Sequence, residues 1–402
     1  MKLLTALLLL CFSLTSCGNN PYKGVPEPYH KLLDEAFAKA GDNRAEMERA
    51  LAETPRDQRE GMAFLIAYMP EYDLTTLKAD YLLKNVSLAY EARNRFAWAK
   101  SVPDDVFLND VLPYANANET RDDWREDFYN RFAPHVENCA TLEEAIYAVN
   151  ANAHPDLKVE YNTARRRADQ SPAESLEISI ASCTGLSILL TDAFRSVGIP
   201  SRLAGTIWSD NRGNHTWSEV WLDGKWYFTE YYFEDLDKAW FLSSAGKAIP
   251  GDPKHGIYAA TYKPAGEPLS LPWYSRPESV SAQEVTQGYL DIYNEVYADR
   301  LASGDYTILR VKMFKANGNV NKSDDRIQVN VDVFRNEDGL QIGGGSTSGP
   351  TRDMNDVLEF MVEKGKEYTV KYFPDGREEV RIVGIGDKPK DLVLFENTVV
   401  IY

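Results

Sequence analysis

Cysteine is scarce in this chain, with four residues in 402, and two of them, Cys11 and Cys17, lie in or beside an N-terminal apolar run. Only Cys139 and Cys183 remain for the rest of the molecule. Two thiols do not make a disulfide scaffold, and a chain of this length can bury a core large enough to need none. We therefore expect two free thiols, with Cys139 as a small buried residue ahead of a helix that starts at Thr141.

An excess of positive charge is also lacking. Lys and Arg number 44 against 61 Asp and Glu, for a net charge of −17, and no basic stripe follows any segment. This excludes nucleic acid as an expected partner, and it gives no support to a polybasic contact with anionic lipid. The five His residues lack the spacing of metal ligands, so we expect neither a metal nor a cofactor. The Gly-rich stretch 343–349 lacks the Lys of a phosphate-binding loop and is predicted to be a flexible loop.

Long hydrophobic runs are absent after the first residues. The run Leu3–Leu14 follows Lys2 and spans about 12 residues, short of the ~20 that cross a membrane. It ends in Leu14-Thr15-Ser16-Cys17, which resembles a bacterial lipobox. The pattern predicts a lipoprotein signal at 1–16, acylation of Cys17 (palmitate) and a tether at 17–28. The protein would then be exported and lipid-anchored to the bacterial cell envelope, at the outer membrane and on its periplasmic or surface face. An ordinary secretory signal with a chance Cys is the alternative.

The secondary structure that the hydrophobic pattern predicts changes along the rest of the chain. Helical spacing dominates 29–137, helices followed by aromatic strands occupy 138–280, and 281–304 reads as a connector helix. From 305 to 402 the pattern is of short alternating strands separated by Gly-containing turns, typical of an antiparallel β-sandwich. The predicted fold class is α+β, with a helical N-terminal region, a mixed core and a β-sandwich.

Cys183 opens an amphipathic helix. Apolar side chains recur at helical spacing through Leu186, Leu190 and Phe194, and Gly198 and Pro200 end the pattern. A thiol in the first turn of a helix faces free backbone N–H groups and the positive end of the helix dipole. Both favour the thiolate, which is the nucleophilic form of cysteine.

His215 begins a strand that an Asp223-Gly224 turn folds back on itself. A two-residue turn pairs Leu222 with Lys225, and this register places His215 and Glu230 on one face as diagonal neighbours within side-chain reach. Glu230 is the predicted third member, and Glu234, which has the same parity, is the alternative if the ladder continues. A Cys nucleophile needs a nearby imidazole base, and that imidazole needs a polar group to orient it. Cys183, His215 and one of these two carboxylates fit those roles.

These motifs resemble the transglutaminase-like core, with its papain-like Cys-His-Asp arrangement. The likeness rests on Cys183-Thr184-Gly185, Gly198-Ile199-Pro200, His215-Thr216-Trp217 and Gly224-Lys225-Trp226, and covers about 100 of the 402 residues. The whole chain is similar to exported lipoproteins of the Bacteroidetes that carry such a core. One departure is Glu230, which stands where the family usually has Asp, so the third member is the least fixed assignment.

The resemblance implies acyl transfer at an amide of a peptide, protein or peptidoglycan-like substrate, by hydrolysis or transamidation through a thioester. The backbone N–H of Cys183 would be one oxyanion donor. Gln170 is either a second donor, through its side chain, or a surface turn residue. The alternative is a catalytically silent lipoprotein that keeps the fold and binds peptides or glycans.

Overall fold

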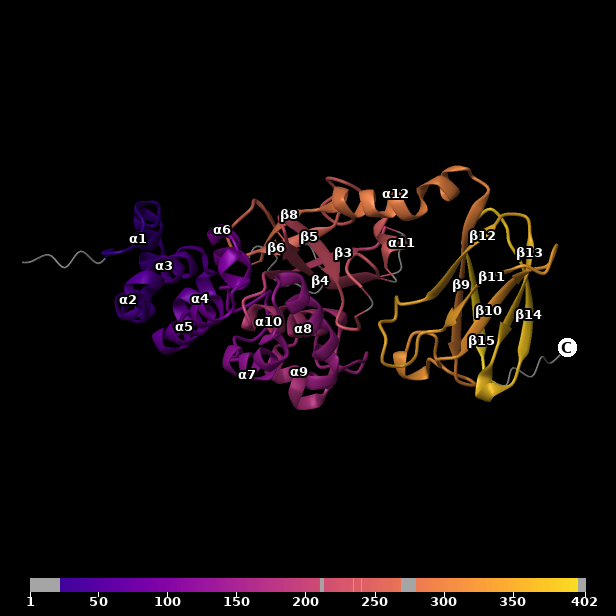
Figure 1. Ribbon diagram of the computed structural model, residues 1–402, viewed down its shortest axis with the longest axis horizontal. Coiled ribbons are helices and arrows are strands. Elements are labelled where there is room, and N and C mark those ends of the chain that lie inside the picture. The colour runs from indigo at the N-terminus through magenta and orange to yellow at the C-terminus, as the bar shows by residue number, and fades with distance from the viewer. Residues whose placement is uncertain (1–21, 210–212, 234, 240, 269–279, 397–402) are drawn as a thin grey trace, which may run out of the picture.

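The computed structural model describes residues 22–209, 213–233, 235–239, 241–268 and 280–396. The predicted signal peptide, Cys17 and Glu234 lie outside these residues. Figure 1 shows three regions along the long axis: helices at one end, a mixed region in the middle and a β-sandwich at the other end. This arrangement agrees with the predicted α+β class.

The N-terminal region consists of helices whose apolar faces share one core. The predicted helical spacing near Leu33, Phe64 and Leu82 corresponds to three of them, and these side chains are buried. Val25, within the predicted tether, is buried against the same cluster. The helices are α1 (His30–Lys39), α2 (Arg44–Glu53), α3 (Arg59–Tyr68), α4 (Glu71–Thr76), α5 (Ala79–Arg95) and α6 (Asp104–Asp110).

A second set of helices surrounds the one that starts at Cys183. Thr141, where the sequence predicts a helix start, forms a capping box with Glu144 at the beginning of α8, and each side chain accepts from a backbone N–H. The most central helix is α10, in which every residue from Thr184 to Ser196 is buried. Gly198, with φ +84°, ends it in a left-handed turn that favours glycine. The set is α7 (Arg125–Val136), α8 (Leu142–Leu157), α9 (Pro172–Ile178) and α10 (Cys183–Ser196).

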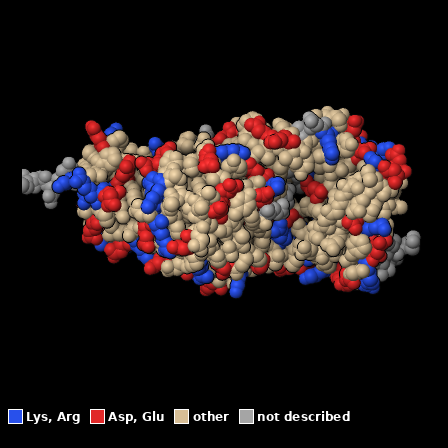
Figure 2. Space-filling model, in the orientation of Figure 1, with Lys and Arg blue, Asp and Glu red and all other residues tan. Residues whose placement is uncertain are grey.

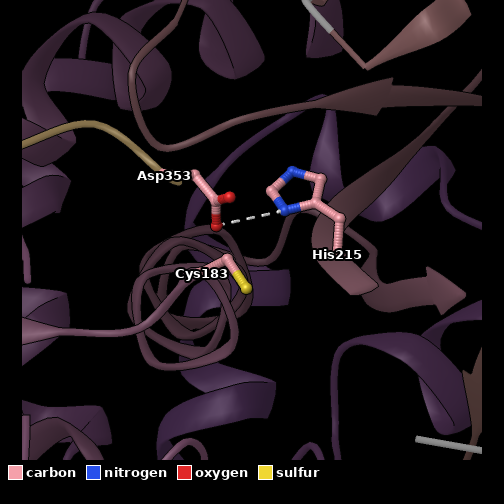
Figure 3. A group of neighbouring side chains, drawn as sticks. All are labelled: Cys183, His215 and Asp353. Atoms are coloured by element: carbon pink, nitrogen blue, oxygen red, sulfur yellow. Dashed lines mark ion pairs between the residues drawn. The ribbon is translucent and has the colours of Figure 1, made fainter. Parts of the chain in front are cut away.

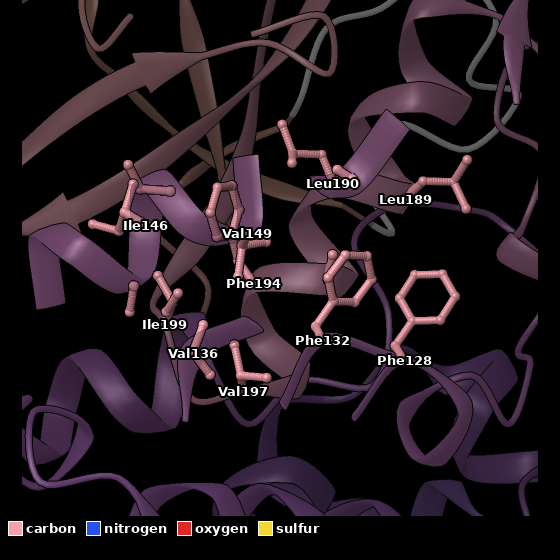
Figure 4. Close-up of a cluster of buried hydrophobic side chains, with 14 of the residues drawn as sticks. Phe128, Phe132, Val136, Ile146, Val149, Leu189, Leu190, Phe194, Val197 and Ile199 are labelled. Atoms are coloured by element: carbon pink, nitrogen blue, oxygen red, sulfur yellow. The ribbon is translucent and has the colours of Figure 1, made fainter. Parts of the chain in front are cut away.

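The core of this middle region forms where α7, α8 and α10 meet (Figure 4). Each large apolar side chain buried there contributes about 1.5–3 kcal/mol to folding. This packing fixes α10 and thereby the position of its first residue, Cys183. The side chains labelled in Figure 4 are Phe128, Phe132, Val136, Ile146, Val149, Leu189, Leu190, Phe194, Val197 and Ile199.

On its other side α10 packs against a six-stranded antiparallel sheet of order β5-β4-β3-β6-β8-β7. The strands are β3 (Ser201–Ile207), β4 (Asn214–Leu222), β5 (Lys225–Thr229), β6 (Tyr258–Thr261), β7 (Glu267–Pro268) and β8 (Ser281–Glu284). A short parallel pair, β1 (Glu160–Tyr161) and β2 (Ile180–Ala181), precedes α10, and the one-turn helix α11 (Leu242–Ala245) follows the hairpin.

The predicted hairpin register is confirmed. Leu222 pairs with Lys225 and the ladder continues to Ser218 opposite Thr229. Asp223 and Gly224 have φ values of +50° and +87°, as a tight turn with two left-handed residues requires. β4 also pairs with β3 on its other side, so the strand that carries His215 is held on both edges.

The predicted connector helix begins later than its sequence pattern indicated. Residues 281–284 form β8, which pairs with β6 and β7, and α12 runs Thr286–Ala302. Tyr289 of α12 is buried and donates a hydrogen bond to Glu219 at 2.7 Å, whereas Val296 is exposed. The first half of the helix is therefore part of the core, and only the second half extends toward the sandwich (Figure 1).

The C-terminal region is the predicted pair of packed sheets. One sheet has the order β11-β10-β13-β14 and the other β12-β9-β15, and their facing side chains form a separate core. One pair departs from the antiparallel pattern, because β15 runs parallel to β9. The strands are β9 (Tyr306–Phe314), β10 (Asn330–Arg335), β11 (Gln341–Ser346), β12 (Leu358–Glu363), β13 (Glu367–Tyr372), β14 (Glu379–Gly384) and β15 (Lys390–Phe395).

The prediction of a loop at 343–349 is wrong in its first part, since Gly343 to Ser346 belong to the edge strand β11. A Cβ at Gly343 would lie 2.9 Å from Phe360, and one at Gly345 would lie 2.7 Å from Leu358. Glycine is needed here because the strand packs closely on side chains of the facing sheet.

Figure 2 shows Asp and Glu side chains scattered over the visible face and interspersed with Lys and Arg. This face carries no basic stripe. Among the residues that the structure describes, no helix has both the length and the apolar character needed to cross a bilayer.

Candidate active site

Cys183 is the first residue of α10. The side chain of Ser182 caps the helix by accepting a hydrogen bond from the backbone N–H of Gly185 at 3.1 Å, and its hydroxyl donates to the carbonyl of Ala168. Cys183 is partly buried and its thiol is free, as is that of Cys139. The helix start therefore presents the sulfur beside free backbone N–H groups.

His215 lies near the start of β4, with its side chain 3% exposed and packed against Trp208, Trp217 and Phe241. Burial alone would lower the pKa of this imidazole by disfavouring its charged form. The carboxylates of Glu230 and Asp353 override that effect and raise the pKa of His215 well above its usual value. The site is therefore built to hold an imidazolium.

Glu230 follows directly after β5 and reaches back to His215. Its Oε1 lies 2.5 Å from Nε2 of the imidazole, which is within the range of a charge-assisted hydrogen bond. This contact is the one that the hairpin register predicted for a diagonal pair. Glu230 therefore has the position of a carboxylate that fixes the orientation of the ring.

Asp353 approaches the same imidazole from a different domain. It lies between β11 and β12 of the sandwich, and its Oδ2 is 3.6 Å from Nδ1 of His215 (Figure 3). Its other oxygen accepts a hydrogen bond from the backbone N–H of Asn355 at 2.7 Å. Burial would raise the pKa of this carboxyl, but the contact with His215 outweighs burial and lowers it. The carboxylate is therefore held ionised.

The two carboxylates take opposite sides of the ring. A ligating atom of Cys183, one of His215 and one of Asp353 all lie within 4.8 Å of one another, whereas Glu230 holds the remaining nitrogen, Nε2. A base that serves a thiol uses one ring nitrogen for the sulfur and the other for the orienting carboxylate. By that criterion Glu230, at Nε2, has the orienting position. Asp353 lies instead at Nδ1, on the side of the ring that faces the thiol.

Gln170 is not brought to this cluster. It is fully buried, its Oε1 accepts from the backbone N–H of Arg166 at 2.9 Å, and its Nε2 donates to the carbonyl of Ile180 at 3.0 Å. The side chain thus ties the turn before α9 to β2, and its amide nitrogen also donates to the hydroxyl of Ser175 at 3.5 Å. Its predicted place as an oxyanion donor does not match this geometry, whereas the backbone N–H of Cys183 stays at the helix start.

The pocket over Cys183 and His215 is small, with a volume of about 30 Å³. Side chains from both domains close it, among them Tyr232 of the core and Arg352 and Asp356 of the sandwich. A larger hollow of about 550 Å³ adjoins it between the core and the sandwich and shares these three residues. Since ligand pockets usually measure ~300–1,000 Å³, the larger of these two adjoining spaces has room for a substrate and the smaller has not.

Residues 351–356 of the sandwich cover the pocket, and we call them the covering segment. Hydrogen bonds join this segment to the core. The side-chain amide of Asn355 donates to the carbonyl of Asn214 at 2.9 Å, and the hydroxyl of Tyr232 donates to the carbonyl of Thr351 at 3.0 Å. Asn214 is the residue before His215. The sandwich is therefore docked directly beside the imidazole.

Comparison with known proteins identifies the family of one part of the core. Residues 130–231 match the model of the Transglutaminase-like superfamily. Among solved structures, the chain is similar to one described as "a Putative Cysteine Protease from Cytophaga hutchinsonii", with 13% identity and a TM-score of 0.27. That match covers 34% of this chain and 45% of the other, so this chain spans less than half of that protein. No curated protein matches the sequence.

The matched range includes the second half of α7, all of α8 and α10, and the hairpin, and thus Cys183, His215 and Glu230. The chain therefore carries a transglutaminase-like domain between a helical region and a pair of β-sheets. Asp353 lies outside the matched range and was missed by sequence reasoning, because nothing local marks an Asp between two strands as the neighbour of a distant His.

Proposed function

We propose that the protein is a cysteine-dependent enzyme that transfers an acyl group from an amide, with Cys183 as nucleophile and His215 as acid and base. The observation that carries this proposal is the placement of a buried imidazole between a helix-start thiol and the carboxylate of Glu230, which is 2.5 Å from Nε2. This combination is what activation of a thiol requires.

The reaction follows from these positions. The thiolate of Cys183 attacks the amide carbonyl, forming a C–S bond, and negative charge develops on the carbonyl oxygen. The backbone N–H of Cys183, at the first position of α10, would donate a hydrogen bond to that oxyanion. The imidazolium of His215 then donates its Nδ1 proton to the departing amine as the C–N bond breaks, leaving a thioester. Water or a second amine, deprotonated by His215, resolves the thioester and restores the thiolate.

The substrate class follows from the chemistry and from the adjoining hollow. An amide bond in a peptide, a protein or a peptidoglycan-like chain provides the carbonyl and the leaving amine. The hollow between the core and the sandwich, lined by His154, Glu160 and Tyr232 among others, is the expected approach to the thiol.

Alkylation by iodoacetamide tests the proposal, with Cys139 as an internal control in the same chain. Burial and the nearby Glu144 raise the pKa of Cys139, so it is expected to react slowly. Cys183 should react at least ten times faster, and His215→Ala should remove that advantage. Equal rates for the two thiols would contradict an activated nucleophile. They would favour the second candidate, a binding protein without turnover, which the small closed pocket also fits.

We also propose export and lipid anchoring through Cys17, on the strength of the apolar run and the Leu14-Thr15-Ser16-Cys17 sequence. The protein should incorporate a palmitate analogue and sediment with the envelope fraction. Cys17→Ala should abolish both. A protein that is secreted without lipid in both forms would instead indicate an ordinary signal peptide.

A further inference from the structure

The side of His215 that faces the thiol gathers three potential metal ligands. Sγ of Cys183, Nδ1 of His215 and a carboxylate oxygen of Asp353 are the kinds of atom that bind zinc, and all lie within 4.8 Å of one another. Two ligands on a tetrahedral zinc, each about 2.1 Å from the metal, are roughly 3.4 Å apart. The Nδ1–Oδ2 distance of 3.6 Å is close to that value.

The surroundings of the imidazole also match those of a zinc ligand. A metal-bound His usually donates its second ring N–H to a carboxylate, which fixes the tautomer and strengthens the ligand. Glu230 is that carboxylate at Nε2, 2.5 Å away. Asp353 is fixed as well, because the backbone N–H of Asn355 holds its Oδ1 and leaves Oδ2 toward the ring.

Charge favours a cation at this position. The sulfur of Cys183 and the carboxyl groups of Asp353 and Glu230 surround a single imidazole, and His215 and Asp353 are buried. The nearest Arg side chains have other contacts: Arg352 pairs with Asp356 at 2.8 Å, and Arg326 donates to the backbone carbonyls of Asp353 and Asp356. A divalent cation would offset the surplus of buried negative charge.

We propose that Cys183, His215 and Asp353 form an inhibitory zinc site that links the core to the β-sandwich. The mixture of sulfur, nitrogen and oxygen ligands selects zinc over calcium and magnesium, which prefer oxygen alone. A pocket of about 30 Å³ leaves room for one water as the fourth ligand.

Binding changes the protonation of the site in a defined way. Zinc forms one bond to sulfur, one to Nδ1 and one to the carboxylate, and the Nδ1 proton of the imidazolium passes to solvent. Nε2 keeps its hydrogen bond to Glu230. The nucleophile and the base are then both engaged by the metal, and Asp353 cannot leave the core while the zinc is bound. Binding of zinc needs no catalytic turnover, but the inhibitory effect rests on the proposed function, because the metal would occupy Cys183 and His215.

Metal titration of the full chain, freed of metal beforehand, tests this site. Zinc should bind in a one-to-one complex, and cobalt(II) should give the near-ultraviolet absorption of a metal–thiolate bond. Asp353→Ala should weaken zinc binding at least tenfold, and Cys183→Ser should abolish the thiolate band. Asp324→Ala is the matched control, because Asp324 accepts a hydrogen bond from Asn162 at 2.8 Å at the same domain interface, outside the cluster. It should bind zinc as the unaltered chain does.

The thermal stability of the protein tests whether zinc links the core to the β-sandwich. Saturating zinc should raise Tm of the unaltered chain by about 5 °C and that of Asp353→Ala by much less. Absence of saturable zinc binding, or equal affinity in Asp353→Ala, would overturn the proposal. Alkylation of Cys183 in the metal-free protein tests the nucleophile separately, so failure of the zinc site and failure of the proposed enzyme give different results.

Discussion

Nε2 of His215 and Oε1 of Glu230 lie 2.5 Å apart at the open end of the β4–β5 hairpin. The contact depends on a two-residue turn that sets which side chains meet several residues away. A shift of one residue in the register would turn Glu230 to the other face of the sheet and take its carboxylate away from His215.

Glu230→Gln should therefore slow the reaction of Cys183 by about 100-fold. The amide can still meet the imidazole, but it carries no charge to stabilise the imidazolium and can favour the wrong tautomer. The rate constant for alkylation of Cys183, or for acylation once a substrate is found, measures the effect. The pKa of His215, followed by NMR, should fall in the same variant.

Glu230→Asp is the matched control for Glu230→Gln, because it keeps the negative charge and shortens the side chain by one methylene. It should retain more activity than Glu230→Gln. If both variants alkylate as fast as the unaltered chain, Glu230 does not orient His215, and Glu234 becomes the residue to replace.

The raised pKa of His215 also predicts how stability depends on pH. A group whose pKa is higher in the folded state stabilises the fold fully below its unfolded pKa, about 6.5 for His, and this contribution is lost as pH rises through the folded pKa. The difference in free energy of unfolding between the unaltered chain and Glu230→Gln should thus be largest near pH 5–6.5 and shrink at higher pH. Urea unfolding followed by Trp fluorescence at several pH values measures it. A difference that grows with pH would contradict the assignment.

Local patterns were enough to predict one half of the site. The helix start at Cys183 and the Asp223-Gly224 turn are short-range signals, and together they place a thiol, an imidazole and Glu230. Asp353 had no such signal, since its position depends on how the sandwich docks on the core. For Gln170 the sequence left a side-chain donor and a surface turn residue as alternatives, and it does not reveal that the side chain is buried or that the carbonyl of Ile180 accepts from its amide.

The same limit applies to the fold. The helical pattern of α12 was visible, but its first four expected residues pair as β8 because the edge of β6 is available to them, which is a tertiary effect. Glycines 343–345 suggested a loop, yet they allow β11 to approach Phe360 and Leu358 of the facing sheet. In both cases packing between elements outweighed the local preference of the chain.

Phe194 tests how strongly the position of Cys183 depends on the core behind it. Phe194 is fully buried in α10, and Phe194→Ala should lower the free energy of unfolding by about 3–5 kcal/mol through lost burial and the cavity left behind. Val296→Ala, at an exposed site of α12, should change it by less than about 0.5 kcal/mol. Chemical denaturation measures both, and a small effect at Phe194 would mean that α10 repacks around the gap.

The segment that covers the thiol should control access to it by size. The side-chain amide of Asn355 donates to the carbonyl of Asn214 across the domain interface, and such a bond contributes about 0.5–1.5 kcal/mol. Asn355→Ala should therefore raise the open fraction of the segment about 2- to 10-fold, while the backbone N–H that holds Asp353 remains. A bulky fluorescent maleimide needs the segment to open, whereas iodoacetamide is small. The rate ratio of maleimide to iodoacetamide at Cys183 should rise in Asn355→Ala and stay unchanged in Asn336→Ala, whose side chain bonds Thr369 within the sandwich. An unchanged ratio in both variants would show that the sandwich does not limit entry, and that reagents reach Cys183 through the hollow beside Tyr232 without displacing Asp353.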